Sequence, residues 1–220
     1  MPQDQSALGF RSVDQNPRYF IDFLDARRSI VGERDVKNLI LELLELHAGR
    51  HVLDVGCGAG DDAREMAGMV APAGRVVGID SSEGMIKEAQ ARVGASPMLE
   101  FRIGEVGKLD FPDNSFDAVR TDRVLMFVSE VDRAISEIHR VLRPGGCVVT
   151  SEIDHETHLV DSPYPETSRK LFAAFGGSMP QRHLGRELLQ RDSIGFDSSP
   201  SHSTTARRVG TRRGRIPRCG

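Results

Sequence analysis

A glycine-rich loop at residues 54–60 (DVGCGAG) can bring the main chain close to a ligand. It follows a short apolar run, and a helix is expected to begin near Asp62. Glycines allow a sharp turn with no Cβ in the way, and the start of a helix offers unpaired backbone N–H groups. A turn that serves only packing would use the same glycines, so this loop alone does not identify a binding site.

The spacing of the glycines discriminates between ligands. A dinucleotide fingerprint, G-x-G-x-x-G, counted from Gly56 and Gly58 needs a third glycine at position 61, where the chain has Asp61, followed by Asp62. Two carboxylates suit the positive end of the helix dipole but repel a pyrophosphate. The loop therefore favours a ligand with little negative charge.

A second acidic position, Asp80, ends the next apolar run. It lies 20 residues after Gly60 (80 − 60), the separation at which a carboxylate meets ribose hydroxyls in nucleotide-binding α/β folds. The alternative is that Asp80, with Ser81 and Ser82, only caps the following helix. Together with the glycine loop, Asp80 favours a ligand that contains adenosine.

The elements that must position these residues follow from hydrophobic spacing. Helical stretches alternate with short apolar runs at residues 51–55, 75–79, 99–103, 116–119 and 146–150. This alternation predicts right-handed βαβ units, and hence a Rossmann-like α/β fold with a parallel sheet and helices on both faces. Ligands of such sheets bind beyond the carboxyl ends of the strands, where the glycine loop and the acid after the second run would lie.

Four sequence motifs follow one another in the central part of the chain. They are VLDVGCGAG at 52–60, VGIDSS at 77–82, FPDNSFDAV at 111–119 and IHRVLRPGG at 138–146. Together they resemble the class I S-adenosylmethionine-dependent methyltransferases, most closely the small-molecule enzymes of the ubiquinone and menaquinone biosynthesis type. The resemblance implies S-adenosylmethionine as cofactor and methyl transfer to an oxygen or carbon atom of a small apolar or aromatic molecule. That cofactor has no phosphate, which agrees with the two acids after the glycine loop.

The resemblance also implies roles for single residues. Asp54 would help to hold the amino group of the cofactor, and Glu105 stands where the family usually has an aspartate for the adenine amino group. Met85 would pack on the adenine, although a core contact explains it equally well. The full set of expected cofactor-binding residues is Asp54, Gly56, Cys57, Gly58, Gly60, Asp80, Ser81, Met85, Gly104, Glu105, Val106 and Arg120.

Methyl transfer asks the protein mainly for positioning and a dry site, with a base where the acceptor is a hydroxyl or an acidic carbon. The candidates for a catalytic group are Arg123, Asp154 and His155, although a lone histidine is more often structural. Amino-group methyltransferases carry Asn or Asp, two prolines and an aromatic residue after the fourth strand, whereas this chain reads Arg-Thr-Asp-Arg after Val119. Methylation of nucleic-acid bases is therefore disfavoured.

Composition excludes several other classes of protein. The 220 residues are 39% hydrophobic and 28% charged, which rules out wholesale disorder, and no apolar run is long enough for a membrane helix. The three cysteines lie far apart, so we expect no metal site and no disulfide scaffold. The N-terminus lacks the pattern of a secretory signal, and the net charge of −3 does not favour nucleic acid. We expect a cytoplasmic protein whose partner is a small-molecule acceptor.

We divide the chain into N-terminal helices on the acceptor side (1–48), a cofactor-binding methyltransferase domain (49–196) and a basic, disordered tail (197–220). The family ends in two antiparallel edge strands, but the tail has six arginines and two large aliphatic residues. We therefore expect these edge strands to be missing or replaced. A bare fifth strand could pair with a second subunit, so we expect a homodimer or marginal stability.

Two other interpretations stay open. An NAD-dependent oxidoreductase would use the same glycine loop and ribose acid, although the missing third glycine speaks against it. A protein that binds the cofactor with little or no turnover would keep the same fold. The resemblance places acceptor specificity in the N-terminal helices and in residues 154–184, whose aromatic residues, histidines and methionine are consistent with an apolar or aromatic acceptor.

Overall fold

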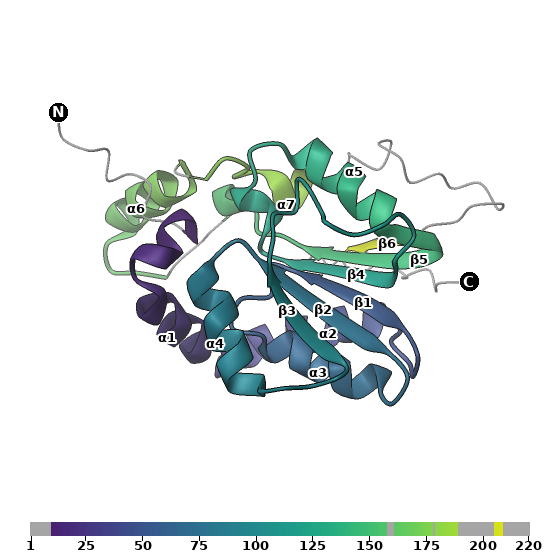
Figure 1. Ribbon diagram of the computed structural model, residues 1–220. Coiled ribbons are helices and arrows are strands. Elements are labelled where there is room, and N and C mark those ends of the chain that lie inside the picture. Colours follow the sequence, from purple (N-terminus) through teal and green to yellow (C-terminus); the bar gives the residue numbers. More distant parts are fainter. Residues whose placement is uncertain (1–9, 158–160, 178, 189–204, 209–220) are drawn as a thin grey trace.

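In the described part of the chain, six parallel strands form one sheet in the order β3-β2-β1-β4-β5-β6 (Figure 1). The computed structural model describes residues 10–157, 161–177, 179–188 and 205–208. The order places β1 and β4 next to each other at the point where the chain reverses its direction across the sheet, the usual ligand position in such folds. The strands are β1 (His51–Val55), β2 (Arg75–Asp80), β3 (Leu99–Ile103), β4 (Phe116–Asp122), β5 (Leu142–Ser151) and β6 (Thr205–Arg208).

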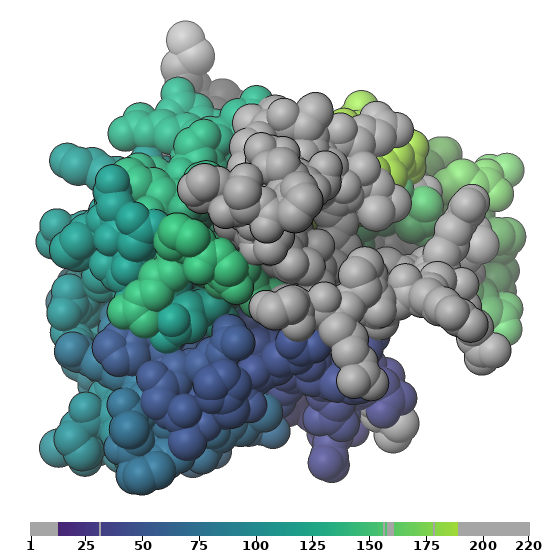
Figure 2. Space-filling model, turned by 90° about the vertical axis from the view of Figure 1, so that its right-hand side faces the viewer, coloured from purple at the N-terminus to yellow at the C-terminus, as the bar shows by residue number. Residues whose placement is uncertain are grey.

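Helices cover both faces of the sheet, which confirms the predicted Rossmann-like fold. In Figure 1, α2, α3 and α4 lie below the sheet, and α5 and α7 lie above it. In Figure 2, the purple and blue residues near the start of the described chain lie in the lower part of the molecule. The α-helices are α1 (Pro17–Arg28), α2 (Val31–Leu43), α3 (Asp61–Val70), α4 (Glu83–Val93), α5 (Val131–Val141), α6 (Pro165–Gly177) and α7 (Leu184–Glu187); the 3-10 helices are η2 (Phe10–Gln15), η3 (Leu125–Phe127) and η4 (His155–Thr157).

Neighbouring residues of the central strands are buried on opposite faces of the sheet. Val52 belongs to the core with Leu44 and Met66, whereas Leu53 belongs to the core with Ile138. Successive side chains of a strand point to opposite faces, so a strand covered on both sides must be apolar at nearly every position. This is why short apolar runs, without alternation, predicted these strands.

The N-terminal segment closes over the ends of β1 and β2. Val13 of η2 and Ile21 of α1 pack against Met85 of α4 in a small core of their own. The Asp14 carboxylate accepts hydrogen bonds from the Ser82 hydroxyl (2.5 Å) and from the backbone N–H of Gly84 (3.0 Å). The N-terminal helices therefore form one wall of the space beyond the carboxyl ends of β1 and β2.

The end of the chain differs from the prediction. Thr205–Arg208 form strand β6, which pairs in parallel with β5, so the expectation that the tail stays apart from the sheet is wrong for these residues. Edge pairing uses main-chain N–H and C=O groups, which any non-proline segment offers whatever its side chains. The β5 edge, whose exposure suggested a homodimer, is paired along 147–150. The other residues of 197–220 lie outside the described ranges.

Among the helices that the structure describes, none combines the length and the apolar character required to cross a lipid bilayer.

Candidate functional site

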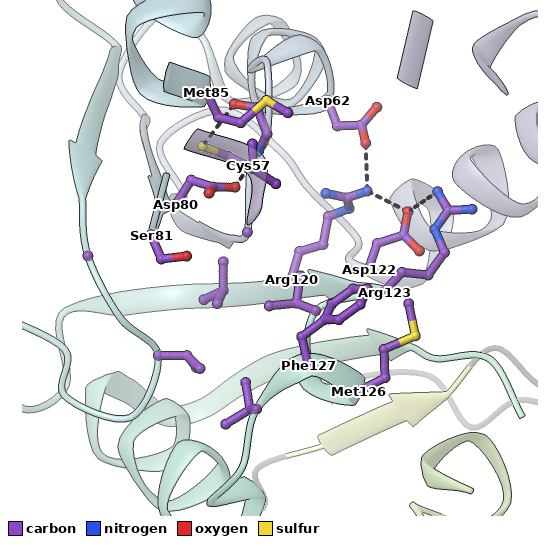
Figure 3. A pocket seen from close by; sticks show the side chains of 18 of the residues that line it. Cys57, Asp62, Asp80, Ser81, Met85, Arg120, Asp122, Arg123, Met126 and Phe127 are labelled. Atoms are coloured by element: carbon purple, nitrogen blue, oxygen red, sulfur yellow. Dashed lines mark hydrogen bonds and ion pairs between the residues drawn. The ribbon is translucent and has the colours of Figure 1, made fainter. Parts of the chain in front are cut away.

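A pocket of about 740 Å³ opens beyond the carboxyl ends of the strands (Figure 3). Its walls come from the loops after β1 to β4, from the N-terminal segment and from the start of α5. Most of the expected cofactor set lines it, whereas Asp54 and Gly60 lie just behind the wall. The members on the wall are Gly56, Cys57, Gly58, Asp80, Ser81, Met85, Gly104, Glu105, Val106 and Arg120.

Asp80 ties the glycine loop to the end of β2. One carboxylate oxygen accepts a hydrogen bond from the backbone N–H of Gly58 (3.0 Å), and the other accepts one from the N–H of Ser82 (2.9 Å). Burial raises the pKa of Asp80, against the effect of these N–H groups. Each oxygen keeps a further lone pair on the side of the pocket, so the carboxylate can accept two hydroxyls of a ribose. The cap of α4 is supplied by Ser82, whose hydroxyl accepts from Met85 N–H (3.1 Å).

The glycines of the loop are needed for two different reasons. A Cβ on Gly56 would come within 2.2 Å of Val124, and a Cβ on Gly60 within 2.6 Å of Phe101, so neither position has room for a side chain. All three glycines have a positive φ, which L-residues rarely adopt: +69° at Gly56, +53° at Gly58 and +83° at Gly60. At Gly58, which lines the pocket, the backbone conformation alone requires glycine, because a Cβ there would meet only Leu24, at 3.4 Å.

Arg120 joins three carboxylates beneath the pocket. Its guanidinium donates hydrogen bonds to Asp62 (2.6 Å) and Asp122 (3.1 Å), as Figure 3 shows, and to Asp54 (2.7 Å). The side chain of Arg120 is almost completely buried. Lys37 of α2 contacts Asp62 and, at 3.4 Å, Asp122. We call these five residues the Arg120 network. Asp54 is completely buried and is not among the described residues that line the pocket, whereas its partner Arg120 lines it.

The network lowers the pKa of Asp62. Burial alone would raise it, but the charges of Arg120 and Lys37 hold it at about 2, below the ordinary 3.8. A carboxyl with a lowered pKa stabilises the fold above its unfolded-state pKa, and this contribution disappears as the pH falls toward the folded-state value. Asp62 therefore contributes to stability at neutral pH and loses its contribution between about pH 4 and pH 2.

We expect Asp62→Asn to lower the free energy of unfolding by about 2 kcal/mol at pH 7 and by about half as much at pH 3. Urea unfolding at the two pH values measures both differences. Asp113→Asn is the control, because Asp113 pairs with Arg140 at an exposed position. An equal loss for Asp62→Asn at both pH values would contradict the role of ionised Asp62.

The three catalytic candidates do not lie together. Arg123 lines the pocket and contacts Glu33 and Asp122, the latter at 3.1 Å. Asp154 faces Arg186 at 2.9 Å, and the buried His155 lies in η4. Neither Asp154 nor His155 is among the described residues that line the pocket.

The same holds for the whole segment that was expected to recognise the acceptor. Of the described residues in 154–184, none lines the pocket. His155 packs instead against Met126, with 3.2 Å between Nε2 and Sδ, and against the ring of Phe175 at 5.5 Å between centroids. The segment supports the loop after β4 from behind.

Several pocket residues have no sequence motif that could have identified them. Helical spacing predicted α1 and α2, but nothing in that spacing indicates which polar residues turn toward the sheet. The pocket residues contributed by the N-terminal segment are Val13, Leu24, Arg27, Arg28, Glu33 and Lys37.

Comparisons with known proteins bear on the chemistry of this site. Residues 53–150 match the family model described as "Methyltransferase domain". The ubiquinone/menaquinone biosynthesis C-methyltransferase UbiE of Pseudomonas putida is 31% identical over an alignment of 236 residues, gaps included, which covers 99% of this chain and 92% of that protein. A demethylmenaquinone methyltransferase of Symbiobacterium thermophilum is 44% identical over 107 residues, which cover 47% of this chain and 43% of that protein.

The matches differ in how much of each relative they span. The chain spans less than half of the length of the Symbiobacterium protein and of one other curated relative, 43% and 48% respectively. Among solved structures, an S-adenosylmethionine-dependent methyltransferase from Aquifex aeolicus is similar with a TM-score of 0.52 and 26% identity. That match covers 64% of this chain and 78% of the other.

Proposed function

Because the chain belongs to the class I S-adenosylmethionine-dependent methyltransferases, we propose that it transfers a methyl group from S-adenosylmethionine to a small apolar or aromatic molecule, at an oxygen or carbon atom. The observation that carries the proposal is the Asp80 carboxylate, which holds the N–H of Gly58 and faces the pocket at the end of β2. A carboxylate at this point suits the two ribose hydroxyls of the cofactor, and the glycine loop leaves room for it.

The pocket offers a suitable surface to each part of the cofactor. Buried Met85 and Val106 supply an apolar surface for the adenine on the β2–β3 side. At the opposite side, the Arg120 network presents both signs of charge, which suits the amino and carboxylate groups of the methionine part. When bound, S-adenosylmethionine supplies a methyl group on a positively charged sulfur, which a nucleophile attacks in line.

The acceptor is proposed to bind between α1 and the turn after β4. Leu24, Met126, Phe127 and Val128 give this part of the pocket an apolar wall. The wall agrees with the quinone-related names of two relatives, and it consists of residues before position 130 rather than of the 154–184 segment. Acceptor specificity is therefore assigned to the N-terminal helices and to the β4 turn.

Arg123 is assigned an electrostatic role in this proposal. Burial lowers the pKa of Arg123, but Asp122 and Glu33 raise it above its ordinary value, so its guanidinium stays protonated and cannot serve as a base. A fixed positive charge beside the pocket can stabilise negative charge that develops on an acceptor oxygen. In this role Arg123 favours acceptors that react as phenolates or enolates.

The test measures methyl transfer with a panel of acceptors. The protein is incubated with S-adenosylmethionine that carries a labelled methyl group, together with simple phenols, catechols and short-chain hydroquinones. The proposal expects label in at least one acceptor and equimolar S-adenosylhomocysteine, with both products lost in Asp80→Ala. Tight binding of the cofactor with no transfer to any acceptor would favour the alternative of a binding protein without turnover.

A further inference from the structure

Glu152, the residue after β5, lies outside the pocket but holds one of its walls. One carboxylate oxygen accepts hydrogen bonds from the backbone N–H groups of Val124 (3.1 Å) and Leu125 (2.8 Å). The other oxygen accepts from the N–H of Met126 (3.2 Å). Three consecutive N–H groups of the turn after β4 therefore converge on a single side chain.

The three N–H groups stand at the start of the 3-10 helix η3, where the helix itself offers them no acceptor. Arg123 has a φ of +59° and the following Val124 has φ −115° and ψ −50°, so a left-handed residue precedes a right-handed one. A positive φ is costly for arginine and persists only where the surroundings hold it. The N–H of Arg123 donates to the carbonyl of Ser151 (2.7 Å), and the next three N–H groups donate to the Glu152 carboxylate, so the end of β5 and the residue after it hold this backbone together.

The supported turn forms the acceptor side of the pocket. Val124 packs so closely on the cofactor loop that a Cβ on Gly56 would overlap it at 2.2 Å. Arg123, held at its unusual φ, pairs with Glu33 of α2, and both residues line the pocket. Phe127 completes the turn on the wall of the pocket.

Other contacts hold the turn from a second direction, so that Glu152 acts on one defined part of it. The backbone N–H of Gln181 donates to the carbonyl of Met126 (3.2 Å), and the Gln181 amide donates to the carbonyl of Ser129 (3.2 Å). These two bonds fix the carbonyl groups of Met126 and Ser129, at the end of the turn. Among the described side chains, Glu152 alone accepts hydrogen bonds from the N–H groups of residues 124–126.

We propose that Glu152 is a positioning residue for methyl transfer: its carboxylate fixes the turn 123–127, and thereby the Arg123 charge and the apolar wall against which the acceptor lies. This inference rests on the proposed function, since it assigns the wall to the acceptor. Burial raises the pKa of Glu152 to about 7 although the three N–H groups act in the opposite direction. A carboxylate kept in so unfavourable a place is consistent with a specific task.

The test compares Glu152→Gln with Glu137→Gln. The glutamine at 152 keeps the size of the side chain but turns an NH₂ group toward at least one of the three N–H donors. Glu137 is the matched control, because it also accepts from a backbone N–H, that of Leu109 (2.8 Å) in the loop after β3, and neither residue is among the described residues that line the pocket. Glu152→Asp, whose carboxylate is one methylene shorter, serves if the glutamine variant does not fold.

Two readouts decide the outcome. Amide hydrogen exchange at 124–126 should be at least about tenfold faster in Glu152→Gln and unchanged in Glu137→Gln. The kcat/KM for the best acceptor of the panel should fall at least about 30-fold, the scale of a small misplacement of reacting groups, with the KM for S-adenosylmethionine within threefold. Exchange at 124–126 equal to wild type, or an equal loss of activity in Glu137→Gln, would overturn the proposal.

These outcomes separate the inference from the function on which it rests. If the wild-type protein methylates none of the acceptors, the proposed function fails, and the exchange experiment still shows whether Glu152 holds the turn. If methyl transfer is found and Glu152→Gln retains it with normal exchange, only the positioning role fails.

Discussion

Replacing Asp80 with alanine is expected to weaken the binding of S-adenosylhomocysteine at least tenfold. The carboxylate can accept two ribose hydroxyls, and hydrogen bonds to a charged group contribute roughly 1.5–3 kcal/mol each, whereas a tenfold change in Kd needs only about 1.4 kcal/mol. The same substitution also frees the Gly58 N–H, which loosens the glycine loop. Isothermal titration calorimetry of the folded variant gives the change in Kd.

The control for this variant is Asp117→Ala at the opposite end of the sheet. Asp117 also accepts from a backbone N–H, that of His51 (2.8 Å), and pairs with Arg143 (2.7 Å), but it lies away from the pocket. It should lose stability and keep its affinity for S-adenosylhomocysteine within twofold. An unchanged Kd in folded Asp80→Ala would contradict the ribose assignment.

Gly58→Val is expected to abolish binding of S-adenosylhomocysteine. Valine is strained at a φ of +53°, and its two methyl groups would extend from a main chain that faces the pocket beside Leu24. The substitution therefore distorts the glycine loop and also fills the space that the ligand needs. Calorimetry with the variant should show no heat of binding at concentrations that saturate the wild-type protein.

Gly49→Val is the control that separates the effect of backbone strain from the effect of filling the pocket. Gly49 has a φ of +91°, and a Cβ there would meet nothing within 4 Å. Gly49→Val should therefore lower thermal stability while it leaves the affinity for S-adenosylhomocysteine near that of the wild type. If Gly58→Val folds and binds as well as Gly49→Val does, the glycine loop is only a packing turn.

The central sheet could be predicted from the sequence because its strands are buried on both faces. Runs such as 51–55 (HVLDV) and 75–79 (RVVGI) have apolar residues at neighbouring positions, and a glycine or an aspartate follows them, so they match β1 and β2 closely. The glycine loop and Asp80 were identified for a similar reason. Their function depends on main-chain shape and on a fixed separation along the chain, both of which a sequence records directly.

The Arg120 network could not be predicted in this way. Lys37 lies on a helix far from Asp62 and Asp122 in the sequence, and only the packing of α2 on the sheet brings the three together. Arg120 was expected at the cofactor, but the sequence did not indicate that its guanidinium would pair with Asp54. Charged pairs of this kind carry no periodic signal.

At the end of the chain, the prediction from the sequence was wrong because it relied on side-chain propensity. Side-chain propensity argued against a strand in the arginine-rich tail, yet Thr205–Arg208 pair with β5 through main-chain groups. Propensity reflects how side chains pack on a pleated surface, and an edge strand depends on this less than a central one. Similarly, Asp154 and His155 follow a strand end, as catalytic residues often do, but the chain turns them away from the pocket.

The central claim is that the pocket at the ends of β1 and β2 takes S-adenosylmethionine rather than a dinucleotide. Calorimetric titration of the wild-type protein with S-adenosylhomocysteine and, separately, with NAD tests it most directly. We expect one molecule of S-adenosylhomocysteine to bind per chain, and no heat of binding with NAD. Binding of NAD, or the absence of S-adenosylhomocysteine binding by the folded protein, would contradict the claim.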